Sequence, residues 1–373
     1  MSEPTATRSA LRKDICRRLN MRFFQRFDEY STLTGSPVAG TPTDSALAED
    51  ADYWNGSWYF AMTGSPALDV RKVDDFVAGG SLTLNRSLSS NPAAGDRYQL
   101  LDYNLSPHML HDAINKAITE SIPYFFQVRL SEDLILQEDT LEYSLSSISP
   151  TVWKIKQVWL EQAQSVKRGV VVSTTGTITT IDSSDTGDVD SSWLLSIYDG
   201  TGKGQQRAVT SVSGAAITHA VWTTNPDTTS KYALWDPTEQ TADWYDLPAL
   251  RVDRREWPDE IHFPNRYVSE WGHRIRIQYL AQPQALTTEA GTTIVPTEYV
   301  VLKALSIIYM QLSNSNRADR QHLRQQATDY EAMAIAYAMK NAFAQPAETL
   351  WMESDLGAPR AGYSEDHNPL GWG

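Results

Sequence analysis

Cysteine is almost absent from this sequence: its 373 residues include one, Cys16. A single thiol can form no intrachain disulfide and cannot supply a multi-thiolate zinc site. Long apolar runs are also missing, because none approaches the roughly 20 residues that cross a bilayer. The first residues lack the apolar core of a secretion signal. We therefore expect a protein made in a reducing cytosol, without a membrane segment.

Basic residues are outnumbered, with 32 Lys and Arg against 46 Asp and Glu and a formal net charge of -14. General binding of duplex DNA or RNA relies on basic side chains that neutralise phosphates, so it is not expected. The charge fits a soluble protein, or one with a face that repels DNA passing nearby. With 41% hydrophobic and 21% charged residues the composition is globular. The length predicts two or three folded units.

Recognisable catalytic motifs are lacking as well. The stretch Gly200–Gly204 superficially suggests a phosphate loop, but a strand-like segment follows in place of a Ser or Thr that opens a helix. A turn between strands is therefore predicted. His108 and His111 can share a helix face, yet no third zinc ligand accompanies them. No Gly-x-Ser-x-Gly elbow of a serine hydrolase is present.

An acidic loop contains Asp182, Asp185, Asp188 and Asp190. Closely spaced carboxylates can surround Ca²⁺, but this spacing differs from that of an EF-hand and the distal Glu is missing. An acidic surface loop is the favoured interpretation, and cation binding stays open. We predict no catalytic, cofactor-binding or metal-ligating residues, and no enzyme activity.

Two stretches have helical periodicity, 106–124 and 297–342. Ser106-Pro107 has the form of a helix start, and Thr297 can act as an N-cap. The polar run Ser313–Asn316 separates two apolar-striped segments, so residues 297–342 are predicted to form an antiparallel helical hairpin. We interpret the hairpin as a packing and assembly element. Its stripes contain Val300, Val301, Leu305, Ile308, Tyr309 and Leu312, then Leu323, Ala327, Tyr330, Ala334, Tyr337 and Ala338.

Short β-like runs separated by glycine turns occur in two stretches that match one another. The spacing predicts two copies of one small antiparallel β-module. The second copy looks inserted between two strand-like segments, 152–162 and 274–280, that could pair with each other. The matched residues are Gly64 and Gly200, Arg71 and Arg207, Val73 and Val209, Leu82 and Ile217, Pro92 and Pro226, Tyr98 and Tyr232, and Leu100 and Leu234.

The predicted fold class is α+β, with a helical hairpin or bundle core, two small antiparallel β-modules of barrel or sandwich form, and an extended C-terminal arm. The predicted divisions are 1–30 for an N-terminal helix, 31–105 for the first β-module, 106–168 for a helix and strands of the core, 169–240 for the inserted second β-module, 241–345 for core strands and the helical hairpin, and 346–373 for the arm.

Two regions are candidates for contacts with partners. Arg12, Arg17 and Arg18 lie on the basic side of a predicted N-terminal helix, which is either a solvated face or a surface that docks on an acidic partner. The stretch 346–373 has little periodicity but contains apolar anchors, so we interpret it as an arm laid on another subunit. Its anchors are Leu350, Trp351, Met352, Tyr363, Leu370 and Trp372.

Assembled in this order, the chain resembles virion proteins of tailed bacteriophages, in particular head–tail connector (adaptor) proteins. The resemblance covers much of the chain. It is carried by Leu11-Arg12-x-Asp14-Ile15 with Trp54-x-Gly56 and Gly95-Asp96-x-Tyr98, by Ser106-Pro107 with Ala113-Ile114-Asn115-x-Ala117-Ile118, and by Arg274-Ile275-Arg276-Ile277-x-Tyr279-Leu280 with Ile294-Val295-Pro296-x-Glu298-Tyr299. The second β-module is also similar to β-domains of phage structural proteins, through Gly200-Thr201-Gly202-x-Gly204-Gln205-x-Arg207.

The resemblance implies a structural subunit of the virion neck. Such connectors form rings, usually dodecamers, that dock beneath the portal protein, meet the tail or its terminator and nozzle proteins, and let DNA pass during ejection without sequence-specific binding. An extended terminus would grip the portal. The chain would be made in the host cytoplasm and end in the virion. It is larger than minimal connectors, so the β-modules would decorate the outer side of the ring.

Two other functions stay open at this point. The chain could be a tail-tip or fibre-associated binding module whose β-modules recognise host-surface carbohydrate through exposed Trp and Tyr. It could also be an enzyme such as a cell-wall hydrolase, although no group of residues in the sequence meets the requirements of a catalytic site.

Overall fold

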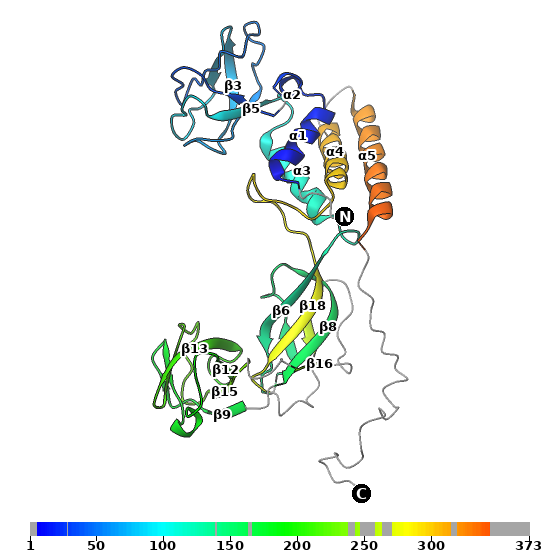
Figure 1. Cartoon of the computed structure of the whole chain (residues 1–373). Helices are drawn as coiled ribbons and strands as arrows, with labels where there is room; N and C mark the ends of the chain where they lie inside the picture. Colours follow the sequence, from blue (N-terminus) through cyan, green and yellow to red (C-terminus); the bar gives the residue numbers. More distant parts are fainter. Residues whose placement is uncertain are drawn as a thin grey trace. The chain divides into compact units, whose positions relative to one another are not determined.

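The computed structural model describes residues 6–27, 29–138, 140–162, 166–237, 243–246, 258–262, 271–314 and 319–343. These residues belong to two compact units (Figure 1). Unit 1 takes Met1–Gln127 together with Pro283–Ala344, and unit 2 takes Val128–Gln282. The chain therefore leaves unit 1, builds unit 2, and returns to complete unit 1.

The described chain is mainly β, and the predicted helical hairpin or bundle core is wrong. It contains 18 strands in four sheets and five α-helices. All five α-helices lie in unit 1, whereas the described part of unit 2 has strands and one 3-10 turn, Ser183–Asp185. Helices confined to one unit cannot form the core of the whole chain, so β-sheets dominate the fold.

Unit 1 contains the first β-module, a five-stranded sheet in which all neighbouring strands are antiparallel. Its strand order is β1-β5-β2-β3-β4. The strands are β1 (Ser31–Thr32), β2 (Trp58–Ala61), β3 (Val70–Val77), β4 (Ser81–Leu84) and β5 (Arg97–Leu101).

The helices of unit 1 are α1 (Arg8–Arg18), α2 (Arg22–Arg26), α3 (Pro107–Thr119), α4 (Thr297–Ser313) and α5 (Arg320–Asn341). Ser106 caps α3 as predicted, because its side chain accepts a hydrogen bond from the Met109 amide and Pro107 occupies the first turn. The predicted cap at Thr297 is wrong: α4 begins at Thr297, and Pro296 stands at the N-cap position without a side-chain hydrogen bond.

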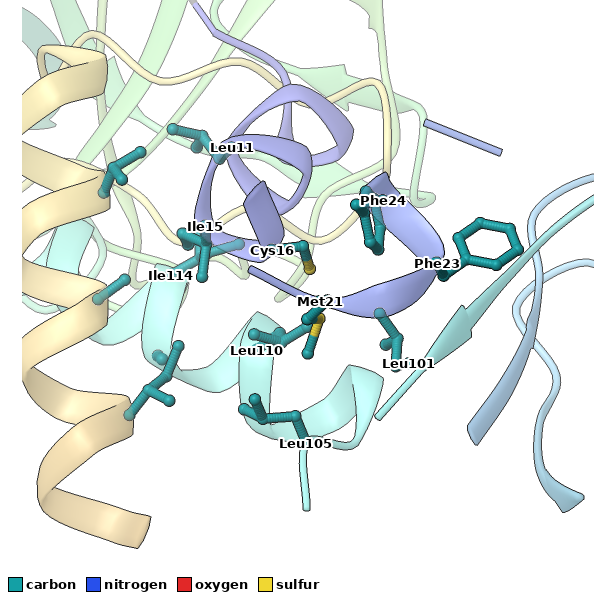
Figure 2. Packing of buried hydrophobic residues seen from close by; sticks show 14 of the residues in the cluster. Leu11, Ile15, Cys16, Met21, Phe23, Phe24, Leu101, Leu105, Leu110 and Ile114 are labelled. Atoms are coloured by element: carbon teal, nitrogen blue, oxygen red, sulfur yellow. The ribbon is translucent and has the colours of Figure 1, made fainter. Parts of the chain in front are cut away.

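One apolar core joins these helices to the β-module. Figure 2 shows Leu11, Ile15 and Cys16 of α1 facing Leu110 and Ile114 of α3, beside the aromatic rings of α2. The same cluster continues into the module and into α4. Cys16 is fully buried there, and burial raises the pKa of its thiol well above the ordinary value, so the thiol stays protonated.

The described part of unit 2 contains three sheets. The seven-stranded sheet of the second β-module has the order β10-β11-β14-β13-β12-β15-β9, a four-stranded sheet has the order β16-β8-β18-β6, and β17 pairs with β7. The strands are β6 (Gln127–Ile135), β7 (Glu142–Ser144), β8 (Val152–Gln162), β9 (Val166–Val170), β10 (Ser173–Thr174), β11 (Ile178–Thr180), β12 (Leu194–Asp199), β13 (Gln205–Ser213), β14 (Ala216–His219), β15 (Lys231–Trp235), β16 (Asp243–Asp246), β17 (Glu260–His262) and β18 (Arg274–Ala281). The predicted pairing of segments 152–162 and 274–280 is confirmed, since β8 pairs with β18 in antiparallel register.

The sequence repeat corresponds to a structural repeat. The order β5-β2-β3-β4 in the first module equals β15-β12-β13-β14 in the second. A break of register follows Val73 in the β3–β4 pair and follows Val209, its counterpart, in the β13–β14 pair. Tyr98 donates to Asp44 at 2.7 Å, and its counterpart Tyr232 donates to Asp185.

The matched arginines are also placed alike in the two modules. Arg71 donates to the carbonyl of Val70 and, through Nε, to the carbonyl of Ser87. Arg207 likewise donates to the preceding carbonyl, that of Gln206, and through Nε to the carbonyl of Val221. Each arginine therefore ties its own strand, β3 or β13, to the segment that follows the next strand, β4 or β14.

Both modules use equivalent positions to dock within their own units. In unit 1, Phe60 of β2 and Gln99 of β5 contact the Arg12 side chain of α1. The counterparts in unit 2 are Ser196 and Ala233, which meet Gly272 just before β18. The Ser196 hydroxyl donates to the Gly272 carbonyl at 2.7 Å, and a Cβ at Gly272 would collide with the methyl group of Ala233.

Candidate functional site

Helix α5 has two apolar faces, and the described residues of the chain cover one of them. Its buried residues are Leu323, Ala327, Ala334 and Ala338, which pack on the α4 side (Figure 1). The small alanine side chains let the two helices approach closely, and Tyr309 of α4 stacks on Tyr330 of α5 with ring planes 6° apart. The predicted contact face of this helix is therefore the one that packs internally.

The second face is an exposed stripe of Ala332, Ile335, Ala336 and Met339. These residues follow the spacing i, i+3, i+4, i+7, which places them on one side of the helix. Met339 is 69% exposed and Ile335 is 37% exposed. A contiguous exposed apolar stripe is a candidate interaction surface. Sequence reasoning had missed it, although the spacing was readable from the sequence.

A groove runs along this stripe between α3, α4 and α5. Its volume is about 620 Å³. Ile307 and Met310 of α4 and Ala332 and Ile335 of α5 supply its apolar lining, and Met310 is 44% exposed. The groove and the stripe share residues of α5, so together they form one apolar surface, called here the α4–α5 face.

Charged side chains form the rim of the groove. Lys303 lies 2.6 Å from a carboxylate oxygen of Glu331 and 3.4 Å from one of Glu120. Lys116 lies 3.6 Å from Glu120, one turn away on α3. The side chain of Lys116 is 58% exposed, the largest value among these four groups. The carboxylates of Glu120 and Glu331 are thus both paired with lysines, and Lys116 is directed largely toward solvent.

The end of α5 is fixed by aromatic contacts. The Phe343 amide donates to the Tyr124 carbonyl at 2.9 Å. The Phe343 ring meets the rings of Phe125 and Phe126 edge to face, with centroids 5.2 and 6.0 Å away. These contacts define where the chain leaves unit 1.

Arg12, a predicted partner-binding residue, is fully buried inside unit 1. Its guanidinium donates to Glu289 at 2.5 Å and to Gln99 at 2.9 Å, and lies 2.8 Å from the His111 ring nitrogen. Its charge is therefore engaged internally and is not presented to a partner. The partners come from sequence positions 87 to 277 residues away, a distance over which no local pattern could have indicated burial.

This buried cluster depends on the protonation states of His111 and Glu289. Burial and the neighbouring Arg12 charge lower the pKa of His111 to about 4, so the ring is neutral at pH 7. Burial opposes ionisation of Glu289, but the charges of Arg12 and Arg8 and the hydrogen bond from Arg12 outweigh it and hold the pKa of this carboxyl below its ordinary value. The cluster joins α1 to α3 and to the segment before α4. It serves the packing of unit 1.

The remaining candidates divide between surface positions and undescribed residues. Arg18 pairs with Glu298 at 2.5 Å on the surface, with side chains 37% and 40% exposed. Arg17 is also exposed, and its role as a partner contact stays a prediction. The predicted arm and its anchors lie outside the described residues: Leu350, Trp351, Met352, Tyr363, Leu370 and Trp372.

The two motifs that resembled ligand sites have structural roles in the described chain. Gly200, Gly202 and Gly204 all have positive φ and form the turn between β12 and β13, as predicted. In the acidic loop, Asp182 and Asp190 each accept hydrogen bonds from a nearby serine.

Two further carboxylates of this loop also have protein partners. Asp185 accepts from Tyr232, and Asp188 pairs with Lys167 at 3.3 Å. Among the described residues, no group of three or more His, Cys, Asp and Glu side chains is arranged to hold a metal ion.

Comparison with known proteins identifies no relative. The chain matches no protein-family model, no curated protein and no solved structure. In the described part of the chain, no helix is both long and apolar enough to cross a bilayer.

Proposed function

We propose that this chain is a non-enzymatic structural subunit of the neck of a tailed bacteriophage. Copies of it assemble into a ring that joins the portal protein to the tail and lets DNA pass. The observation that carries the proposal is the α4–α5 face, an apolar surface that the described residues of the chain leave uncovered. The occupant we assign to that face is a second copy of this chain.

Two features support a neighbour at this face. Long apolar side chains such as Met339 and Ile335 are exposed on a helix whose opposite side is already packed. Burying apolar surface is worth about 25 cal/mol per Å², so covering this face with part of a second copy is favourable. The sequence resemblance to head–tail connectors then supplies the expectation that the meeting is repeated around a closed ring.

The alternative of carbohydrate binding receives less support. It depended on exposed Trp and Tyr side chains. Every tryptophan in the described part of the chain is buried or partly buried, whereas Tyr53 and Tyr103 of the first β-module are 41% and 61% exposed. Trp193 and Trp222 of the second β-module are each 4% exposed, and Trp235 is fully buried. These rings fill cores in place of forming a platform for a sugar.

Ring formation can be tested with the purified full chain by sedimentation and negative-stain microscopy. We expect annular particles, and we expect the Met339→Glu variant to remain dissociated because a carboxylate on the stripe would have to be desolvated. Gln325→Glu is the matched control, with the same added charge at an exposed position on the same helix. A full chain that remains monomeric at high concentration and with portal protein present would refute the proposal.

A further inference from the structure

The groove of the α4–α5 face has the dimensions and lining of a receptor for a short apolar segment. It is open along one side, its volume is about 620 Å³, and its floor combines Ile307 and Met310 with Ile335. A volume of this size accommodates a few large side chains. The identity of the segment follows from where the chain leaves unit 1 and from what comes next in the sequence.

The last described residue, Phe343, lies beyond one end of the groove of its own subunit. The groove-lining residues of α5 extend from Ala327 to Ile335, whereas the helix continues to Asn341 and the aromatic contacts hold Phe343. Ile335 precedes Phe343 by 343 − 335 = 8 residues. At about 1.5 Å per residue the exit lies roughly 12 Å beyond the near end of the groove.

The next apolar residues in the sequence are Leu350, Trp351 and Met352. The six residues 344–349 connect Phe343 to them and span at most about 20 Å when fully extended. If the segment turned back toward the groove of its own subunit, it would need roughly 12 Å of this length to reach the near end of the groove.

Size and charge match the groove to this segment. A tryptophan flanked by two aliphatic side chains is a typical anchor of protein interfaces. Glu348 and Glu353 flank the three apolar residues, and Lys116 on the rim is 58% exposed. An acidic segment therefore meets the one rim charge that is directed mostly toward solvent.

We infer that the segment Leu350–Met352 of one subunit inserts into the α4–α5 groove of the next. This inference rests on the proposed function, because it names the contact that links neighbouring copies of the ring. The groove is the receiving side and the C-terminal segment is the inserting side, so the interface is head-to-tail, as a closed ring requires.

A cysteine cross-link tests the contact directly. One full-length variant has Gln311→Cys at the groove and another has Thr349→Cys beside the anchors. Cys16 is buried with a raised thiol pKa and does not compete. Mixing the two variants under mild oxidation is expected to give a disulfide-linked pair of chains. The control carries Gln321→Cys, at an exposed α5 position outside the groove, in place of Gln311→Cys. With this control the yield of the disulfide-linked pair should be at least ten-fold lower.

The outcomes separate this inference from the proposed function. A cross-link that forms only within one chain, in a variant with both cysteines, would overturn the assignment to a neighbour. Annular particles without any cross-link would refute the groove contact and still support ring formation. A linked pair without annular particles would support the groove contact and refute ring formation.

A second measurement covers variants whose cysteines perturb the segment. Trp351→Ala should weaken self-association at least ten-fold, whereas Leu130→Ala, at a 59% exposed position of unit 2, should alter it less than two-fold. Equal effects of the two substitutions would count against insertion at Trp351.

Discussion

The buried Arg12 cluster predicts that two arginines of the same helix differ sharply in their contribution to stability. Arg12 has no exposed side-chain surface and contacts Glu289, Gln99 and the Phe60 ring, whose centroid is 4.8 Å from the guanidinium carbon. Removing one partner of a buried ion pair costs about 3–5 kcal/mol. Arg8 still lies 2.8 Å from Glu289 after the change, so we expect the lower end, about 3 kcal/mol, for Arg12→Met.

Arg18→Met is the matched control. The Arg18–Glu298 pair is exposed on both sides, and such pairs contribute about 0–1 kcal/mol. Hydrogen exchange of the α1 and α3 amides under native conditions measures the stability of unit 1 in each variant. Equal protection in the Arg12 and Arg18 variants would show that the Arg12 cluster does not hold α1 in place.

Two further predictions concern titration and the repeated modules. The pKa of His111 falls from 6.5 in the unfolded chain to about 4 in the folded one, so acidification from pH 6.5 to 4 protonates the unfolded state first and destabilises unit 1, by on the order of 3 kcal/mol. His111→Asn should flatten thermal stability over that pH range, and an unchanged slope would contradict this origin. Tyr98→Phe should destabilise the first module by about 1–3 kcal/mol, and Tyr232→Phe should destabilise the second by about 1 kcal/mol, as measured by urea unfolding. The reason is that Asp44, the acceptor of Tyr98, is fully buried, whereas Asp185, the acceptor of Tyr232, is only partly buried. The reverse order would mean that burial does not set the strength of these hydrogen bonds.

The sequence predicted local structure better than it predicted the overall fold class. Periodicity located α4 and α5, and Ser106-Pro107 located the start of α3, because those signals are contained within a few turns of chain. The repeat was also detectable, since glycine and proline spacing reflects turns whose geometry is local. The class was wrong because two long periodic helices were taken as the core, whereas many short strands build both units.

The candidate site shows the same division between local and distant information. The stripe of Ala332, Ile335, Ala336 and Met339 could be detected in the sequence from its helical spacing. The spacing alone does not indicate which of the two apolar faces of the helix is packed against the rest of the unit. That required α4 to be placed on the opposite side. Arg12 was expected on a basic surface. Its burial is explained by its ion pair with Glu289, a residue far away in the sequence.

The two β-modules show where functional differences within one chain can arise. Inward positions are apolar in both copies: Leu33 corresponds to Val171, and both are buried. Outward positions are free to differ, because they do not determine the fold. Thr32 and Thr34 of the first copy correspond to Val170 and Val172 of the second, which are 51% and 55% exposed. One backbone therefore presents a polar edge in unit 1 and an apolar edge in unit 2. The strand order from β5 to β4, the register break and the buried tyrosine recur in the second module, so differing outward positions such as these are one source of different contacts, beside the additional strands β10 and β11.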